Sequence, residues 1–162
     1  MTFEERIDRF CAHHPQAPRD FILGSRLLLR TARLLRQHAQ RALAPLALDL
    51  EQYLVLSMLA TDREKLSMPS ELGTVLDATR TQMTRLLDGL ESRDLVRRHA
   101  SAHDRRSLEL ELTAAGQRLL KRAAPLVHEA YTQAWTALEP AAFASTSRSL
   151  AQVHARLQEL QP

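Results

Sequence analysis

Apolar residues recur at helical spacing along most of this chain, and the pattern changes to a strand-like alternation in one region only. Seven segments have helical periodicity, namely residues 2–12, 20–43, 50–60, 69–76, 80–91, 114–138 and 140–160. Two short runs, 95–99 and 108–113, predict strands, and the second alternates apolar and acidic residues, which indicates one buried face. The pattern therefore predicts a mainly α protein with a single β-hairpin.

Polar residues at the predicted helix starts agree with this division. Thr2, Asp49 and Thr113 are placed to be N-caps, and either Asp77 or Thr79 should cap the segment 80–91. These residues accept a hydrogen bond from a backbone N–H that the helix itself leaves unpaired. We expect four of the helices to begin at these positions.

The segment 80–91 has one apolar stripe, formed by Met83, Leu86, Leu87 and Leu90. Its opposite face carries Arg80, Thr81, Gln82, Thr84, Arg85 and Asp88. Such side chains reach base edges and phosphates, and the first turns are where a recognition helix reads DNA. With the preceding helix 69–76 and the hairpin, the layout predicts a winged helix-turn-helix lobe over residues 50–113.

The charge distribution favours the same interpretation. The formal net charge of the whole chain is +3, and residues 80–106 alone contribute seven basic minus four acidic side chains, also +3. Clustered positive charge is typical of phosphate contact. Twenty of the 22 basic residues are arginine, which suits phosphate and guanine recognition, although a GC-rich genome produces the same bias.

Long apolar-striped helices flank the predicted lobe on both sides, within residues 1–45 and 114–162. A monomer would leave these stripes partly exposed, and a symmetric homodimer would cover them. We expect one chain, 1–162, whose two ends are dimerisation helices. Tyr131 and Trp135 are more consistent with packing in the dimer than with ligand stacking.

Several other classes of protein have less support in the sequence. There is one cysteine, no apolar run of the roughly 20 residues needed to span a bilayer, and no signal-peptide pattern, so we expect a cytoplasmic protein without a membrane partner. No catalytic or phosphate-loop motif is present, which predicts a non-enzyme without cofactor. Three alternatives remain: a metal sensor using His13–His14 or His99 and His103, a thiol redox sensor using Cys11, and a protein-interaction module.

The run LESRDLVRRHASAHDRRSLELELTAAGQRLL resembles the MarR family of bacterial transcription regulators. Its most specific parts are Asp104-Arg105-Arg106 and the exit Leu112-Thr113-Ala-Ala-Gly116. The stretch from Thr79 to Leu90 resembles the recognition helix of that family. The subfamily most similar is that of the multidrug-efflux repressors.

The resemblance implies a ligand-responsive repressor that binds a pseudo-palindromic double-stranded operator as a homodimer. Small phenolic or hydrophobic effectors would release it from an efflux or aromatic-stress operon. The implied DNA-binding residues are Ser70, Thr79, Arg80, Thr81, Gln82, Thr84, Arg85, His103, Arg105 and Arg106, with Asp104 buttressing the wing. The implied effector-pocket residues are Arg33, Arg36, Tyr53 and Arg98, and no metal ligand is implied.

One position departs from the family pattern. The family commonly has glycine at the turn before the first wing strand, where this chain has Asp94. Aspartate tolerates the left-handed backbone conformation better than most residues, so we expect the turn to form.

Overall fold

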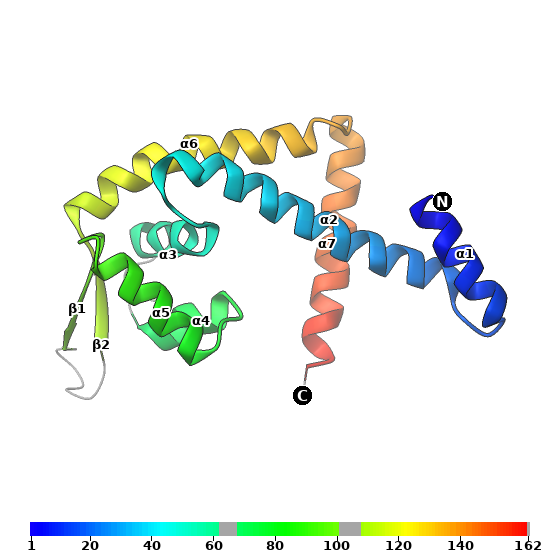
Figure 1. Cartoon of the computed structure of the whole chain (residues 1–162), viewed down its shortest axis with the longest axis horizontal. Coiled ribbons are helices and arrows are strands. Elements are labelled where there is room, and N and C mark those ends of the chain that lie inside the picture. Colours follow the sequence, from blue (N-terminus) through cyan, green and yellow to red (C-terminus); the bar gives the residue numbers. More distant parts are fainter. Residues whose placement is uncertain (62–67, 101–107, 162) are drawn as a thin grey trace.

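The computed structural model describes residues 1–61, 68–100 and 108–161 (Figure 1). Within them it has seven α-helices, one 3₁₀ helix and two strands. In order these are α1 (Phe3–His13), α2 (Arg19–Leu43), η1 (Ala44–Leu46), α3 (Leu50–Thr61), α4 (Pro69–Val75), α5 (Arg80–Glu91), β1 (Val96–Ala100), β2 (Leu108–Leu112), α6 (Ala114–Trp135) and α7 (Pro140–Glu159). The predicted mainly α fold with one hairpin is confirmed.

The helix starts form as the sequence predicts. The side chains of Thr2, Asp49, Thr79 and Thr113 each accept a hydrogen bond from the backbone N–H three residues later. Asp77 is not the cap of α5; it lies in the preceding turn with φ 51°. Short-range polar chemistry therefore sets where α1, α3, α5 and α6 begin.

The molecule has a compact lobe at one end and long helices that extend from it (Figure 1). α2 and α6 run side by side, and α3, α4, α5 and the hairpin gather beneath one end of this pair. α1 packs against the far end of α2. The lobe is the winged helix-turn-helix that the sequence predicts.

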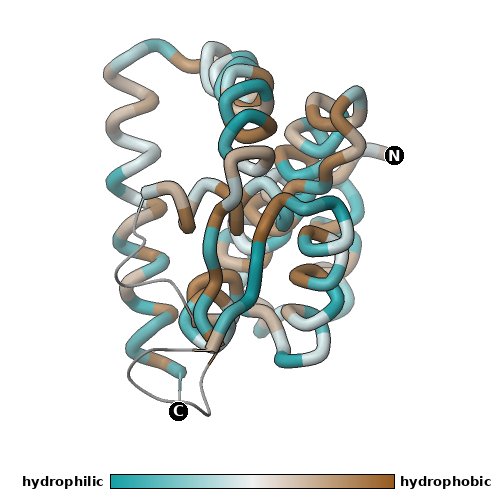
Figure 2. Tube along the Cα trace, turned by 90° about the vertical axis from the view of Figure 1, so that its left-hand side faces the viewer, coloured by the Kyte–Doolittle hydropathy of each residue, from teal (hydrophilic) through white to brown (hydrophobic). Residues whose placement is uncertain are grey.

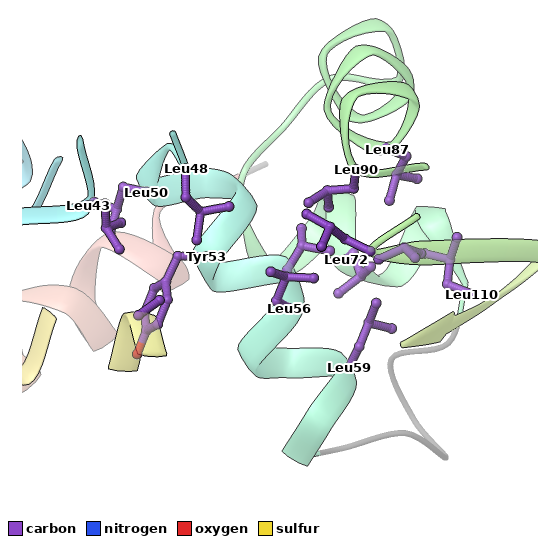
Figure 3. Packing of buried hydrophobic residues seen from close by; sticks show 14 of the residues in the cluster. Leu43, Leu48, Leu50, Tyr53, Leu56, Leu59, Leu72, Leu87, Leu90 and Leu110 are labelled. Carbon is purple, nitrogen blue, oxygen red and sulfur yellow. The ribbon is translucent and has the colours of Figure 1, made fainter. Parts of the chain in front are cut away.

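A single apolar core holds the lobe together (Figure 3). Leu56 of α3, Leu72 of α4, Leu87 and Leu90 of α5, and Leu110 of β2 are all at most 2% exposed. The predicted stripe of α5 thus forms part of this core, which leaves the opposite face of the helix outward. Packing against three other elements fixes how α5 is presented.

The two wing strands pair antiparallel, with Val96 opposite Leu112 and Ala100 opposite Leu108. Val96 and Leu110 are buried, but Leu108 is 48% exposed. The prediction that the apolar positions of this strand all share a buried face is therefore wrong at Leu108. The hairpin extends beyond the core at that end, so no described residue fully covers Leu108.

Two close backbone features join the hairpin to its neighbours. Asp94 has φ 53°, the left-handed conformation expected for the turn, and its N–H donates to the Glu91 carbonyl at 2.9 Å. Gly116, in the first turn of α6, lies so near the Leu95 carbonyl that an added Cβ would be 2.2 Å from its oxygen. A side chain at position 116 would therefore push α6 away from the hairpin.

Large apolar faces remain uncovered on the long helices. On α2, Phe21 is 79% exposed and Leu29 is 71% exposed, and α7 has no buried residue. Figure 2 shows apolar residues distributed along α7, which stands apart from the lobe. Exposed apolar surface of this extent marks an interaction surface.

No single helix in the described ranges is long and apolar enough to cross a membrane. One bent pair, residues 19–46 with 50–61, passes a test of length and composition when its two parts are taken together.

Candidate nucleic-acid interface

The first turns of α5 present a continuous polar surface. Arg80, Thr81, Gln82, Thr84 and Arg85 are all exposed, as the sequence predicts. They are held there because Met83, Leu87 and Leu90 are anchored in the core on the other side of the helix. The surface is therefore rigidly mounted on the lobe.

A reciprocal hydrogen-bonded cap fixes the start of α5. The Thr79 N–H and the Thr79 hydroxyl both donate to Oε1 of Gln82, each at 2.8 Å. In return the Gln82 N–H donates to Oγ1 of Thr79 at 3.3 Å. Both side chains are on the expected DNA-binding surface, and the Thr79 hydroxyl is already occupied by the cap.

The arginines around α5 divide into two groups. Arg80 and Arg85 form no ion pair or hydrogen bond through their side chains with the described part of the chain. By contrast, Arg97 is paired with Asp94 at 3.2 Å, and Arg93 donates to the carbonyls of Leu46 and Ala47. Positive charge on the first turns of α5 is therefore free to meet an anion, whereas charge near the hairpin base is used internally.

Arg98 fastens the first wing strand to α5. Its guanidinium lies 2.7 Å from Oδ1 of Asp88 and 3.4 Å from Oε2 of Glu91, and the Arg98 N–H donates to Oε1 of Glu91. Only 22% of the Arg98 side chain is exposed. These carboxylates are functional partners that sequence reasoning missed, because no spacing rule relates a strand residue to a helix seven to ten positions earlier.

A cleft of about 840 Å³ lies between α4, α5 and the hairpin. Its walls include Pro69, Thr74, Met83, Leu108 and Arg98. Four residues of the predicted DNA-binding surface also line it, namely Ser70, Thr79, Arg80 and Thr84. A molecule in this cleft would therefore contact the surface that is expected to read DNA.

The four residues implied for an effector pocket are not brought together. Arg98 lines the cleft, but Arg33, Arg36 and Tyr53 do not. Arg33 is exposed on α2, and Arg36 forms an ion pair with Glu51 of α3. Tyr53 is buried in the core beneath α2 and α6, and burial, with Tyr131 nearby, raises the pKa of its hydroxyl. Of the four, Arg98 alone is on the wing side of the lobe.

The remaining residues that the sequence singled out have less structural support as functional sites. His103, Asp104, Arg105 and Arg106 lie outside the residues that the structure describes. Cys11 is half-buried in α1. Among the described residues, no group of three His, Cys, Asp or Glu side chains could hold a metal ion.

Comparison with known proteins relates this chain to transcription regulators. The MarR family model matches residues 48–107. The transcriptional repressor MprA of Escherichia coli K12 is 30% identical over 135 residues, which cover 83% of this chain and 77% of MprA. This relative is a regulator of transcription rather than an enzyme.

Solved structures agree with the sequence matches. The Mycobacterium tuberculosis MarR family protein Rv2887, crystallised with p-aminosalicylic acid, is 31% identical, with a TM-score of 0.64 over 80% of this chain and 97% of that one. A variant of MarR from E. coli in complex with operator DNA is 24% identical, with a TM-score of 0.75 over 83% of this chain and 95% of that one. The second likeness concerns the fold alone. On its sequence, its winged helix and these relatives, the chain belongs to the MarR family of transcription regulators.

Proposed function

We propose that this protein is a homodimeric repressor that binds a pseudo-palindromic operator and is released by a small aromatic or hydrophobic effector. The observation that carries the proposal is the polar face on the first turns of α5, where Arg80 and Arg85 have no carboxylate partner among the described residues. In a winged helix-turn-helix this face enters the major groove, and the wing lies over the adjacent minor groove.

On this proposal, DNA is contacted from the helix-turn-helix and from the wing. Residues 79–85 of α5, with Ser70 at the start of α4, face the major groove. The wing residues His103, Arg105 and Arg106 contact the duplex beside it, and Asp104 supports them; this part rests on sequence resemblance. Because it acts on chromosomal DNA, the protein works in the cytoplasm.

Dimerisation is supported by the apolar faces of α2 and α7, which no part of the chain that the structure describes covers. Residues 1–45 and 114–162 would form the dimer, and residues 50–113 the DNA-binding lobe. A two-fold dimer presents two copies of α5 to two half-sites, which is why the operator should be pseudo-palindromic.

The cleft beside α5 is the proposed effector site. It combines apolar walls, such as Met83 and Leu108, with hydroxyls and two guanidinium groups, those of Arg80 and Arg98. This is the usual composition of a small-molecule site. An effector there would contact residues needed for DNA and would lower operator affinity, as expected for control of an efflux or aromatic-stress operon. The crystallised complex of Rv2887 with p-aminosalicylic acid supports this class of effector.

The DNA-reading role is tested with Arg85→Ala, compared with Arg122→Ala as a control. Arg122 is an exposed arginine on α6, outside the set of residues expected to contact DNA. We expect Arg85→Ala to weaken operator binding by roughly 1–3 kcal/mol and to reduce the dependence on salt, while Arg122→Ala leaves both unchanged. Binding should fall steeply as salt rises, because each neutralised phosphate releases counterions. Equal affinity of all three proteins over several salt concentrations would contradict this role and favour a protein-interaction module.

The effector role is tested by adding salicylate and other phenolic acids or hydrophobic drugs to the preformed complex with DNA. We expect at least one to release the operator from the wild type and to act more weakly on Arg98→Gln. If a broad panel leaves operator affinity unchanged, control by such ligands is refuted even though DNA binding stands.

A further inference from the structure

The amide of Gln82 is exposed in the first turn of α5, but only half of it is available to a partner. Its oxygen, Oε1, accepts from both the N–H and the hydroxyl of Thr79, each at 2.8 Å. An amide oxygen has two lone pairs, so both are occupied. The amide nitrogen, Nε2, has no partner among the described residues, which leaves its two N–H donors unpaired on an exposed residue.

This orientation of the amide is held by more than one interaction. The Thr79 hydroxyl donates to Oε1 of Gln82 and accepts from the Gln82 backbone N–H at 3.3 Å, so the two residues lock each other. Turning the amide over would put Nε2 against the Thr79 backbone N–H, which can only donate, and would break the cap at the start of the helix. Gln82 is therefore preset as a donor before it meets DNA.

We propose that Gln82 determines operator specificity by reading a guanine through Nε2 alone. This inference rests on the proposed function, in which α5 lies in the major groove. A free glutamine amide matches adenine, because it accepts from N6 and donates to N7. With Oε1 occupied, Gln82 can only donate. Guanine offers two adjacent acceptors, N7 and O6, whereas cytosine offers only a donor in this groove.

The substitution Gln82→Glu gives a matched test. A carboxylate at this position keeps the acceptor that the cap requires, since glutamate is also a capping-box residue. It removes both N–H donors. The thermal unfolding midpoint of Gln82→Glu should therefore remain close to that of the wild type, while its base preference changes. Gln82→Ala, which loses both the cap and the donors, is the second variant.

The experiment first selects binding sequences from random duplexes with the full-length wild-type protein. Affinities are then measured for the wild type and both variants on duplexes with each base substituted at every position. We expect one position in each half-site where the wild type prefers guanine by roughly fivefold or more and both variants lose the preference. Replacing that guanine by 7-deazaguanine or 2-aminopurine, each of which lacks one acceptor, should weaken wild-type binding only.

Other results overturn the inference in distinguishable ways. A preference for adenine or thymine that depends on Gln82 would mean that the amide oxygen is released or that a single acceptor is read. Identical base preferences in all three proteins would mean that Gln82 reads no base. In both cases operator binding stands. If the wild type selects no sequence, the proposed function fails and this inference fails with it.

Discussion

At the scale of single residues, Gly116 is the glycine that leaves the least room for a side chain. A Cβ there would lie 2.2 Å from the Leu95 carbonyl oxygen and 2.6 Å from Cδ1 of Leu112. The leucine side chain can move, but the backbone carbonyl is fixed by the turn that precedes β1. We predict that Gly116→Ala lowers the free energy of unfolding by roughly 2–3 kcal/mol, through overpacking.

Gly24 provides the matched control for this prediction. It is also a helical glycine, but it is exposed and an added Cβ meets nothing within 4 Å. Gly24→Ala should raise the free energy of unfolding by about 1 kcal/mol, because alanine is the better helix former. Both variants are measured by denaturant unfolding at one protein concentration. Equal effects of the two substitutions would show that the contact at Gly116 is not strained.

Asp94 shows how far local chemistry can be predicted. The sequence predicts a left-handed turn at this position, and the structure has φ 53° there. Its carboxylate pairs with Arg97, three residues later, so the residue fits a position where the family commonly has glycine. By contrast, nothing in the sequence indicates that Ala47 adopts φ 48°. The Arg93 guanidinium holds its carbonyl, and these two residues are 46 positions apart.

At the scale of elements, Thr113 joins the hairpin to α6. Its hydroxyl donates to the Asp94 carbonyl at 2.6 Å and accepts from the Gly116 N–H at 2.9 Å. Thr113→Val keeps the shape but removes both bonds and leaves the buried Gly116 N–H unpaired. We predict a loss of roughly 1–3 kcal/mol in the free energy of unfolding.

Thr113→Ser, which keeps the hydroxyl, is the control, and its free energy of unfolding should fall by less than about 1 kcal/mol. Hydrogen exchange at the Gly116 amide separates this mechanism from simple packing. The amide should exchange faster in Thr113→Val and stay protected in Thr113→Ser. If both substitutions leave the amide equally protected, the hydroxyl is not what joins the two elements.

The elements themselves were predictable because their signals are local. The stripe of α5 and its cap at Thr79 depend on residues within one or two turns of each other, and both are confirmed. Contacts between elements were not predictable. The pairing of Arg98 with Asp88 depends on how β1 docks against α5, and the exposure of Leu108 depends on where the core ends. The effector-pocket residues implied by the resemblance lie apart in the structure, and the sequence could not show this for the same reason. Only the packed fold shows that Arg98 lines the cleft.

At the scale of the whole molecule, the exposed faces of α2 and α7 indicate a dimer. Leu29 is 71% exposed and Leu157 is 52% exposed, although each lies on an otherwise well-formed helix. A charged side chain on such a face removes apolar contact from the interface and places an unpaired charge in a buried position. We predict that Leu29→Lys combined with Leu157→Lys converts the protein to a monomer in sedimentation equilibrium at micromolar concentration.

Val75→Lys is the control for the dimer prediction. Val75 is 55% exposed on α4, in the DNA-binding lobe rather than on the long helices. It should remain dimeric, with an unchanged sedimentation profile. A wild type that sediments as a monomer would refute the assignment of these helices to dimerisation, whatever the variants do.

In the proposed function, two copies of α5, related by two-fold symmetry, read DNA. The most direct measurement is the set of sequences that the wild type selects from random duplexes. We predict an inverted repeat whose half-site centres are about 10 base pairs apart, or a multiple of that, because successive major grooves face one side of the duplex at this spacing. Selection of a single unrepeated site, or of no sequence at all, would contradict the claim.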